Sequence, residues 1–261
     1  MSEQKLDVPS SSTLRNILKL TSRNFRASLD REFLVIQLVL PLFFIFVAGF
    51  GYTLLIQGVE GVPYETFLAT GAVAMTVMSS SMLSGTMIWF DRNFAMFEQI
   101  LMGPFSRAQY IASVLLSVIV TGLFSALIVF LVSLTVAPGM RFGVFNIAEL
   151  FGALILGSVF FGSLGIFVSL RVKSSEALAA MMNLTFFLFT FLSSVFYPSS
   201  SKYFILRVIF DINPLTYVAD LVRNGLLGLS GFNIIVETVV LGAECIFMAS
   251  LASRAINKIE L

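Results

Sequence analysis

The stretch FDRNFAMFEQILMGPFSR, residues 90–107, separates two long apolar runs at 65–89 and 109–136. Its apolar and charged residues recur with the period of an amphipathic helix. Gly103-Pro104 is expected to end this helix, because proline cannot continue a helix and restricts the residue before it. The sequence therefore predicts a short helix that links two membrane spans and offers a surface to a partner.

Helical spacing places Phe94, Phe97 and Leu101 on a common face, since residues three and four apart are neighbours on a helix. Phe90 extends this face by one turn. Charged and amide residues occupy other positions around the helix: Asp91, Arg92, Glu98 and Gln99. Such a helix can pack beneath the membrane bundle with one side and present the other side to another protein.

The overall composition is that of a membrane protein. Of the 261 residues, 57% are hydrophobic and 12% are charged, whereas soluble domains carry about 25% charged residues. The 16 basic and 15 acidic residues nearly balance, which does not suggest a nucleic-acid partner. One cysteine and no histidine exclude an intramolecular disulfide and any Ser-His or Cys-His catalytic pair.

No motif for nucleotide binding or hydrolysis occurs, such as G-x-x-x-x-G-K-[ST] or G-x-S-x-G. We therefore expect no catalytic residue, cofactor site or metal site in this chain. If the protein uses ATP, another chain must bring it.

Six apolar stretches are each near the length of about 20 residues that crosses a bilayer as a helix. They cover residues 33–56, 65–89, 109–136, 147–170, 177–197 and 233–252. Pro41 predicts a kink in the first span, and small residues in the second and fourth spans predict close helix approach. The predicted fold class is all-α: a polytopic membrane protein with six transmembrane helices.

Residues 11–29 predict a basic amphipathic helix before the first span. Its apolar stripe consists of Leu14, Ile17, Leu18, Phe25 and Leu29, and its basic residues cluster on a different face. We favour a helix that lies in the membrane interface against anionic headgroups, because a span follows directly. The alternative is an ordinary solvated helix, or one that binds a calmodulin-like partner.

Twelve of the 16 basic residues fall on one side of the spans when the N-terminus is placed in the cytoplasm. The outer segments hold the remaining four: Arg141, Lys202, Arg207 and Arg223. The positive-inside rule therefore predicts that both termini and the 90–107 helix are cytoplasmic. Residues 1–32 are expected to be a cytoplasmic N-terminus without a cleavable signal peptide, and residues 33–261 a single transmembrane domain.

The last outer segment, 198–232, contains two short amphipathic pieces that Asn213-Pro214 divides. The pieces cover 201–210 and 215–227, and Gly228 is expected to cap the second one. Neither piece is long enough to span a bilayer. They predict a pair of re-entrant half-helices in the outer leaflet, placed to cap an outward exit.

Polar groups inside the predicted spans are candidates for a substrate path. Inserting the carboxylate of Glu244, in the middle of the sixth span, costs about 2.5–3.5 kcal/mol. Glu244 belongs either to a substrate or proton path or, the interpretation we favour, to the bundle interior as a protonated or hydrogen-bonded residue. The other candidates lie in spans two and five: Thr76, Ser79, Ser80, Ser84, Asn183, Thr185, Phe186 and Phe187. They either line a path or pack and bond within their own helices.

In their order along the chain, these features resemble the permease subunits of ABC transporters of the second exporter class, of the drug-resistance and nodulation-exporter kind. One shared motif is Y-x-x-F-L-x-x-G, found at Tyr64, Phe67, Leu68 and Gly71. A second comprises Asp91, Arg92, Glu98, Ile100, Leu101, Pro104, Phe105, Ser106 and Arg107. The third, N-P-L-T-Y-V-x-D-x-x-R-x-x-L-x-G, runs from Asn213 to Gly228. Ala95 departs from the pattern, because glycine is expected there.

The resemblance implies that two permease chains pair as a homodimer and that each docks a separate ATPase subunit, which binds ATP and Mg. It implies that the second motif, together with Phe94 and Phe97, forms the coupling helix that contacts this ATPase. It also implies an outer gate, formed here by Asn213, Pro214, Tyr217, Asp220, Arg223 and Gly228. Spans one, two and five of both chains would frame the central path.

We therefore expect the permease of an ATP-driven exporter, embedded in the lipid of the cell membrane. An apolar, phenylalanine-rich path suits an amphipathic cargo such as a drug, a lipid or a lipid-linked saccharide. Two alternatives remain open: a secondary transporter driven by an ion gradient, and a membrane assembly subunit that transports nothing.

Overall fold

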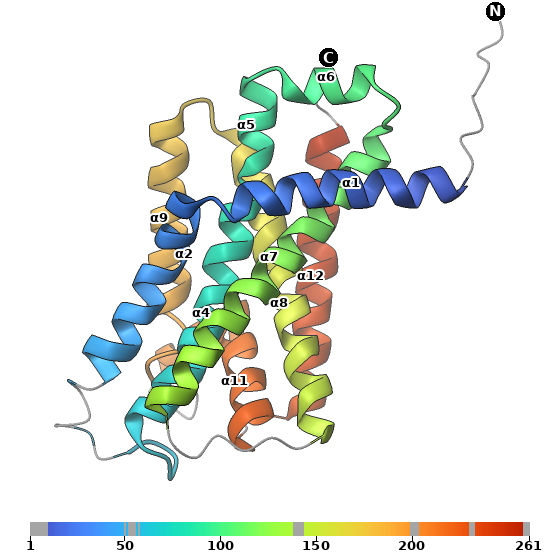
Figure 1. Ribbon diagram of the computed structural model, residues 1–261. Coiled ribbons are helices and arrows are strands. Elements are labelled where there is room, and N and C mark those ends of the chain that lie inside the picture. The colour runs from blue at the N-terminus through green and yellow to red at the C-terminus, as the bar shows by residue number, and fades with distance from the viewer. Residues whose placement is uncertain are drawn as a thin grey trace, which may run out of the picture.

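The computed structural model describes residues 10–49, 51, 56, 58–137, 144–198, 204–229 and 233–257. Within this part of the chain every regular element is helical, and Val59 and Val62 pair only as an isolated bridge in a turn. The long helices form one bundle, and α1, Ser10–Ser28, lies across one end of it (Figure 1). The predicted all-α class is confirmed for the described residues.

The chain passes from α1 into α2, Arg31–Phe43, which continues as a π-helix, η1, at Phe44–Gly49. The remaining long helices are α4 (Tyr64–Gly85), α7 (Arg107–Val136), α8 (Val144–Arg171), α9 (Ser175–Phe191) and α12 (Ile234–Asn257). The short helices are α5 (Met87–Asn93), α6 (Met96–Met102), α10 (Phe204–Ile212) and α11 (Pro214–Leu227). α6 lies across the same end as α1, and α11 lies at the opposite end (Figure 1).

Four helical segments are long and apolar enough to cross a membrane: Tyr64–Asn93, Arg107–Val136, Ile147–Arg171 and Ile234–Ile256. They correspond to predicted spans two, three, four and six. The count of six is not reproduced. The first predicted span, 33–56, is described as α2 and η1 as far as Gly49, and residues 50, 52–55 and 57 lie outside the described residues.

The fifth predicted span, 177–197, is too long. Its helix, α9, has 17 residues and ends at Phe191, which at 1.5 Å per residue makes it about 25 Å long. The Nδ2 atom of Asn213 donates hydrogen bonds to the carbonyl oxygens of Phe189 and Leu192, at 2.8 and 2.7 Å. These oxygens are acceptors that the C-terminus of a helix leaves free. The Asn213 side chain, from another part of the chain, therefore stabilises the C-terminal end of α9 where it stops short of the predicted span.

Helix α4 forms the centre of the bundle and is buried along almost its whole length. It approaches α8 so closely that backbone meets backbone. A Cβ atom added to Gly165 would lie 2.2 Å from the carbonyl oxygen of Met82, and one added to Gly85 would lie 2.4 Å from that of Gly162. The predicted close approach of the second and fourth spans is confirmed, because only residues without a side chain permit this contact.

Helix α1 packs on α7 with a face that the sequence does not single out. Leu20, Thr21 and Asn24 are buried, and Thr21 Oγ1 lies 3.3 Å from the carbonyl oxygen of Ser113. Two residues of the predicted apolar stripe, Leu14 and Leu18, are 62% and 52% exposed. An apolar strip left uncovered beside basic residues is the surface that an interfacial helix presents to lipid.

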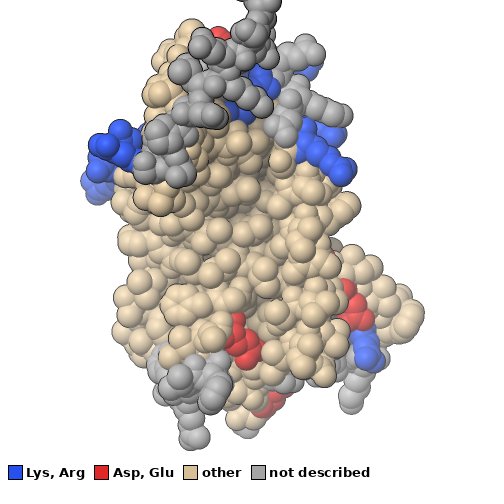
Figure 2. Space-filling model, turned by 90° about the vertical axis from the view of Figure 1, so that its right-hand side faces the viewer, with Lys and Arg blue, Asp and Glu red and all other residues tan. Residues whose placement is uncertain are grey.

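Ten of the twelve described basic residues lie at the α1 end of the bundle, and the face in Figure 2 shows several of them together there. The ten are Arg15, Lys19, Arg23, Arg26, Arg31, Arg92, Arg107, Arg171, Lys173 and Arg254. Arg207 and Arg223 lie at the opposite end, with α10 and α11. The folded chain therefore keeps the charge asymmetry that its sequence predicts.

We predict that Gly165→Ala lowers the free energy of unfolding by about 1–3 kcal/mol, because the added methyl group meets backbone that no rotamer change can clear. Thermal unfolding of the purified chain in detergent measures the change. Gly152→Ala in the same helix is the matched control, since nothing lies within 4 Å of a Cβ atom there. Equal destabilisation by both substitutions would contradict the role of this backbone contact.

Candidate functional site

The stretch between the second and third long helices forms a foot at the α1 end of the bundle. We use the name foot for residues 87–107, which comprise α5, α6 and the connection to α7. α5 continues the direction of α4, whereas α6 lies across the bundle end (Figure 1). The foot contacts α1, α7 and α8 through side chains of the second sequence motif.

The prediction of one continuous helix from residue 90 is wrong. α5 ends at Asn93, and Ala95 turns the chain in the left-handed region, with φ at 55°, before α6 begins. A Cβ atom is strained in that region, which is the physical reason why glycine is expected at this position. The break also separates Phe94 from Phe97: they are 70% and 3% exposed, so the predicted common face does not form.

Phe97 and Ile100 hold α6 against the bundle. Both are buried in an apolar cluster that includes Leu20 of α1 and Tyr110 of α7. The rings of Phe97 and Tyr110 meet edge to face, with 5.1 Å between their centroids. Phe97 is therefore packed inside this chain and has no side-chain surface to offer a partner. The side chain of Leu101, which was expected on the same face, lies outside the described residues.

Asp91 joins the foot to two other helices. Its Oδ2 atom accepts hydrogen bonds from Nη2 of Arg23 in α1, at 2.6 Å, and from the hydroxyl of Tyr110 in α7, at 2.8 Å. The Asp91 side chain is 12% exposed, so little water competes for these bonds. Sequence spacing places Asp91 on the polar side of a helix but does not identify Arg23 or Tyr110, because both reach it only through the tertiary fold.

Arg92 joins the foot to the end of α8. Its guanidinium donates to the carbonyl oxygens of Leu170 and Val172, at 3.1 and 3.0 Å, and the Trp89 indole nitrogen donates to Val172 at 3.2 Å. The C-terminus of a helix has free carbonyl oxygens and favours a positive charge. Adjacent residues Asp91 and Arg92 thus fix the foot to α1, α7 and α8 together.

Hydrogen bonds and apolar packing fix the connection from α6 to α7 along its length. Asn16 Nδ2 of α1 donates to the carbonyl oxygen of Pro104 at 3.2 Å. Phe105 packs against the apolar cluster that buries Phe97. Ser106 and Gln109 form a capping box at the start of α7, in which each side chain bonds to the other's backbone N–H. Arg107 is the first residue of α7 and is half-buried.

The outward side of the foot combines apolar and charged residues. Phe90 and Phe94 stack nearly parallel, with 6.3 Å between their ring centroids. Phe94 and Met102 are 70% and 80% exposed, and Met96 and Glu98 are also exposed. We call these five residues the foot surface. Aromatic and methionine side chains that project from a rigid support are typical of protein interfaces.

At the opposite end of the bundle, Arg223 and Asp220 of α11 form a buried ion pair at 2.8 Å. Ser194 Oγ donates to the same Asp220 oxygen at 2.9 Å. Arg223 Nη2 donates to the carbonyl oxygens of Ser194 and Val195, at 2.6 and 3.2 Å, and its guanidinium lies 3.7 Å from the centroid of the Phe67 ring. α11 thereby holds the turn at 192–197 against α4. We call this arrangement the outer cluster.

The first and third sequence motifs meet in the outer cluster. Phe67 supplies the ring beneath Arg223, and Tyr64 contributes its hydroxyl 3.5 Å from the carbonyl oxygen of Phe196. Gly71 completes the fit, because a Cβ atom there would lie 2.7 Å from the carbonyl oxygen of Val195. Sequence reasoning found both motifs but not their contact.

The boundaries of α11 follow the predicted signals closely. Asn213 Oδ1 caps the helix by accepting from the Leu215 N–H at 3.0 Å, and Pro214 occupies the first helical position. Gly228 ends it with φ at 71°, and the Tyr217 hydroxyl donates to the Asp211 carbonyl oxygen. Of the predicted outer-gate residues, Asp220 and Arg223 contact the turn directly and Asn213 secures the end of α9.

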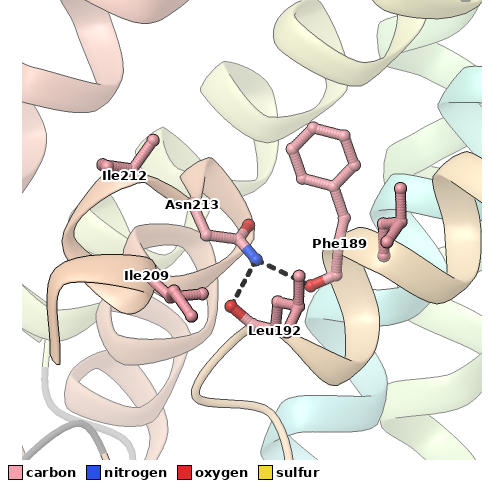
Figure 3. Close-up of a pocket in the computed structure, with 6 residues that line it drawn as sticks. Phe189, Leu192, Ile209, Ile212 and Asn213 are labelled. Carbon is pink, nitrogen blue, oxygen red and sulfur yellow. Dashed lines mark hydrogen bonds between the residues drawn. The ribbon is translucent and has the colours of Figure 1, made fainter. Parts of the chain in front are cut away.

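An apolar pocket of about 300 Å³ lies between α9 and α10 beside Asn213 (Figure 3). It is lined by Leu188, Phe189, Leu192, Ile209, Ile212 and Asn213. The amide nitrogen of Asn213 bonds to the end of α9 and its oxygen caps α11, so both polar atoms are already used. The pocket wall therefore offers mainly apolar surface.

The predicted path residues divide into two groups. Ser79, Asn183, Phe186 and Phe187 line one groove between α2, α4 and α9, the helices of predicted spans one, two and five. The others do not line it: Thr76, Ser80, Ser84 and Thr185. Thr76, Ser80 and Thr185 donate to carbonyl oxygens four residues earlier in their own helices, as expected of hydroxyl groups inside a membrane.

Glu244 lies in α12 and is half-buried, and its Oε2 atom has no hydrogen-bond partner within the described residues. Glu237, seven residues earlier, is fully buried. Cys245 Sγ lies 2.9 Å from the carbonyl oxygen of Leu156, so this part of α12 packs on α8. The position agrees with a carboxyl group inside the bundle.

The chain was compared with known protein families. The family described as ABC-2 type transporter matches residues 15–227, a range that contains most of α1, the foot and the outer cluster. Comparison with individually curated proteins gives no match.

We predict that Asp91→Asn increases the rate of amide hydrogen exchange in α1 about tenfold, because the amide cannot replace a charged hydrogen bond to Arg23 that is worth about 1–2 kcal/mol. Exchange measured by mass spectrometry on the full chain tests this. Glu98→Gln is the control, since it removes an equal charge from the exposed side of α6. Unchanged exchange in α1 after Asp91→Asn would show that the pair does not hold α1.

We predict that Arg223→Met lowers the free energy of unfolding by about 3–5 kcal/mol, because Asp220 is left as an uncompensated buried charge. Arg223→Met combined with Asp220→Asn should recover part of this loss. Arg207→Met, at an exposed arginine of α10, should have little effect. Thermal unfolding in detergent measures the stability of all three variants. Equal stability of Arg223→Met and Arg207→Met would contradict the prediction.

Proposed function

Since the chain belongs to the ABC-2 type transporter family, we propose that it is the membrane-spanning permease of an ATP-driven exporter for an amphipathic cargo. A permease of this family is a membrane component of a transporter and typically works with ABC ATPase subunits. In this proposal the ATPase is a separate chain that binds ATP and Mg, and the permease supplies the path.

The foot surface is the observation that supports coupling to such an ATPase. Phe94, directly after α5, and Met102, the last residue of α6, are 70% and 80% exposed, and the carboxylate of Glu98 is exposed as well. Apolar anchors supply most of the affinity in protein interfaces, and charged neighbours set the register. We propose that the foot surface seats in a groove of the ATPase.

Work done on the foot can reach the membrane only through rigid contacts. Asp91 links the foot to α1 and α7, and Arg92 links it to α8. The buried side of α6 adds apolar packing through Phe97 and Ile100. Displacement of the foot would therefore move α1, α7 and α8 together with α4, which α5 continues and which α8 also contacts through its glycines.

We propose that the end of the bundle that carries α1 and the foot faces the cytoplasm. The basic residues concentrated there support this orientation by the positive-inside rule. α1 would then lie in the cytoplasmic interface of the cell membrane, with Leu14 and Leu18 toward lipid. Two copies of the chain, each with one ATPase, would form the working transporter.

In this arrangement α10 and α11 form the outer gate, and the groove between α2, α4 and α9 borders the path. The groove contains phenylalanine side chains together with Ser79 and Asn183, and none of the described residues that line it is charged. Mixed apolar and neutral polar walls suit amphipathic molecules better than inorganic ions.

The test is to co-express the full chain with the ABC ATPase encoded beside it and to quantify the ATPase that co-purifies. Phe94→Ala combined with Met102→Ala should reduce the co-purified ATPase about tenfold, the loss expected for removing central apolar anchors. Phe204→Ala is the matched control, because Phe204 is 79% exposed at the opposite end of the bundle.

Thermal unfolding of each variant separates interface loss from misfolding. The foot-surface variant should unfold at the temperature of the original chain, since neither replaced side chain is buried. Undiminished co-purification in this variant, or an equal loss with Phe204→Ala, would count against coupling through the foot.

A further inference from the structure

The exposed side of α1 carries two parallel rows of side chains. Leu14 and Leu18 form an apolar row. At 3.6 residues per turn a polar row lies directly beside it, and its members, all exposed, are Arg15, Lys19, Ser22 and Arg26. An open hollow of about 420 Å³ lies where the two rows meet, and the described residues that line it are Leu14, Arg15, Leu18, Lys19 and Ser22.

The positive charges of the polar row are not neutralised within the described part of the chain. Arg23, the remaining basic residue of α1, is paired with Asp91. Arg15, Lys19 and Arg26 form no ion pair with a described residue, and α1 contains no acidic residue. Three like charges along about 17 Å of one helix face repel one another, so the row favours a negatively charged partner.

The apolar row beside these charges indicates the kind of partner. α1 ends at Ser28, and α2, the helix of the first predicted span, begins at Arg31. In the proposed orientation α1 therefore lies at the membrane surface, across the end of the bundle (Figure 1). A helix with adjacent apolar and basic rows binds the interface of a bilayer that contains anionic lipid. An acidic protein surface matches the charges, but lipid matches both rows.

The other side of the same helix holds the foot. Asn16 Nδ2 donates to the carbonyl oxygen of Pro104 at 3.2 Å, and Arg23 Nη2 donates to Asp91 Oδ2 at 2.6 Å. Asn16 and Arg23 each lie within about one turn of a basic residue of the polar row. A restraint on the exposed side of α1 therefore acts close to the bonds that fix the foot.

We propose that the exposed side of α1 binds anionic phospholipid and that this binding steadies the foot. Phosphate groups contact the polar row, and an acyl chain lies along Leu14 and Leu18. The proposal rests on the proposed function for the role of the foot and adds a regulator to it. The anionic lipid content of the membrane sets how firmly the foot is held when the ATPase acts on it.

The test compares the full chain, without the ATPase, in two kinds of lipid nanodisc. One contains phosphatidylcholine alone, and the other contains equal parts of phosphatidylcholine and phosphatidylglycerol. Hydrogen exchange by mass spectrometry reports on α1 and α6, and native mass spectrometry counts the phosphatidylglycerol that stays bound. We expect exchange in both helices to slow about tenfold in the anionic discs, whereas exchange in α11, at the opposite end, should not change.

Arg15→Gln combined with Lys19→Gln should abolish most of this difference. The affinity for phosphatidylglycerol should fall about 25-fold, because each basic residue near an anionic surface contributes about fivefold. Arg15→Lys combined with Lys19→Arg keeps both charges and should keep the lipid response. Arg171→Gln combined with Lys173→Gln is the matched control, since it removes equal charge from the exposed turn between α8 and α9 at the same end of the bundle.

Asp91→Asn separates lipid binding from its effect on the foot. This variant should retain as much phosphatidylglycerol as the original chain, because Asp91 does not belong to either exposed row. Exchange in α6 should respond to the anionic lipid much less, since the charged bond between α1 and the foot is lost. A full response of α6 in this variant would overturn the link from α1 to the foot.

Equal exchange of the original chain in both discs, or an equal loss with the control pair, would overturn lipid binding by α1. Thermal unfolding of each variant in detergent should be unchanged, because the replaced basic side chains are exposed. If Arg15→Gln with Lys19→Gln instead lowers the co-purified ATPase and leaves the lipid response intact, α1 binds an acidic protein surface and the proposal is wrong. The lipid measurements do not involve the ATPase, so their failure is distinct from a failure of coupling through the foot.

Discussion

Every interruption of a helix in a membrane protein leaves carbonyl oxygens that lipid cannot hydrate, and the structure of this chain depends on how those oxygens are satisfied. Arg92 donates hydrogen bonds to carbonyl oxygens at the end of α8, and Asn213 does the same at the end of α9. Arg223 donates to the carbonyl oxygens of the turn that follows α9. In each case the side chain that satisfies these oxygens comes from a distant segment of the chain. The short elements at both ends of the bundle are thereby fixed to the long helices.

The two ends use this constraint differently. At the outer cluster nearly every polar group faces inward, with Arg223 and Asp220 buried beneath the turn. At the foot the inward side is equally well held, by Asp91 and Arg92, but an apolar surface remains uncovered on the outside. A segment that is rigidly attached on one side and free on the other is suited to receive force from a second protein. The family of the chain supplies the kind of protein that would do so.

The predictions from sequence succeeded where a local rule decides. Asn213-Pro214 and Gly228 predict the limits of α11, because capping and a left-handed terminal residue are properties of a few adjacent residues. They failed where the backbone departs from the regular helix. The spacing of apolar residues in 90–107 predicts one helix, but Ala95 lies in the left-handed region, and that single break moves Phe94 off the face of Phe97. Partners such as Tyr110 for Asp91 and Ser194 for Arg223 have no sequence signal.

Sequence alone is enough to predict the helical class, four helices long and apolar enough to cross a membrane, the charge asymmetry of the two ends and the family. These depend on composition, on period and on residues close together in the chain. The packing of the helices sets where α9 ends, which side of α6 is exposed, and how Phe67 meets Arg223 and Gly71 meets Val195. Those features depend on contacts between segments far apart in sequence, and burial and hydrogen bonding act on such segments only after the helices have packed.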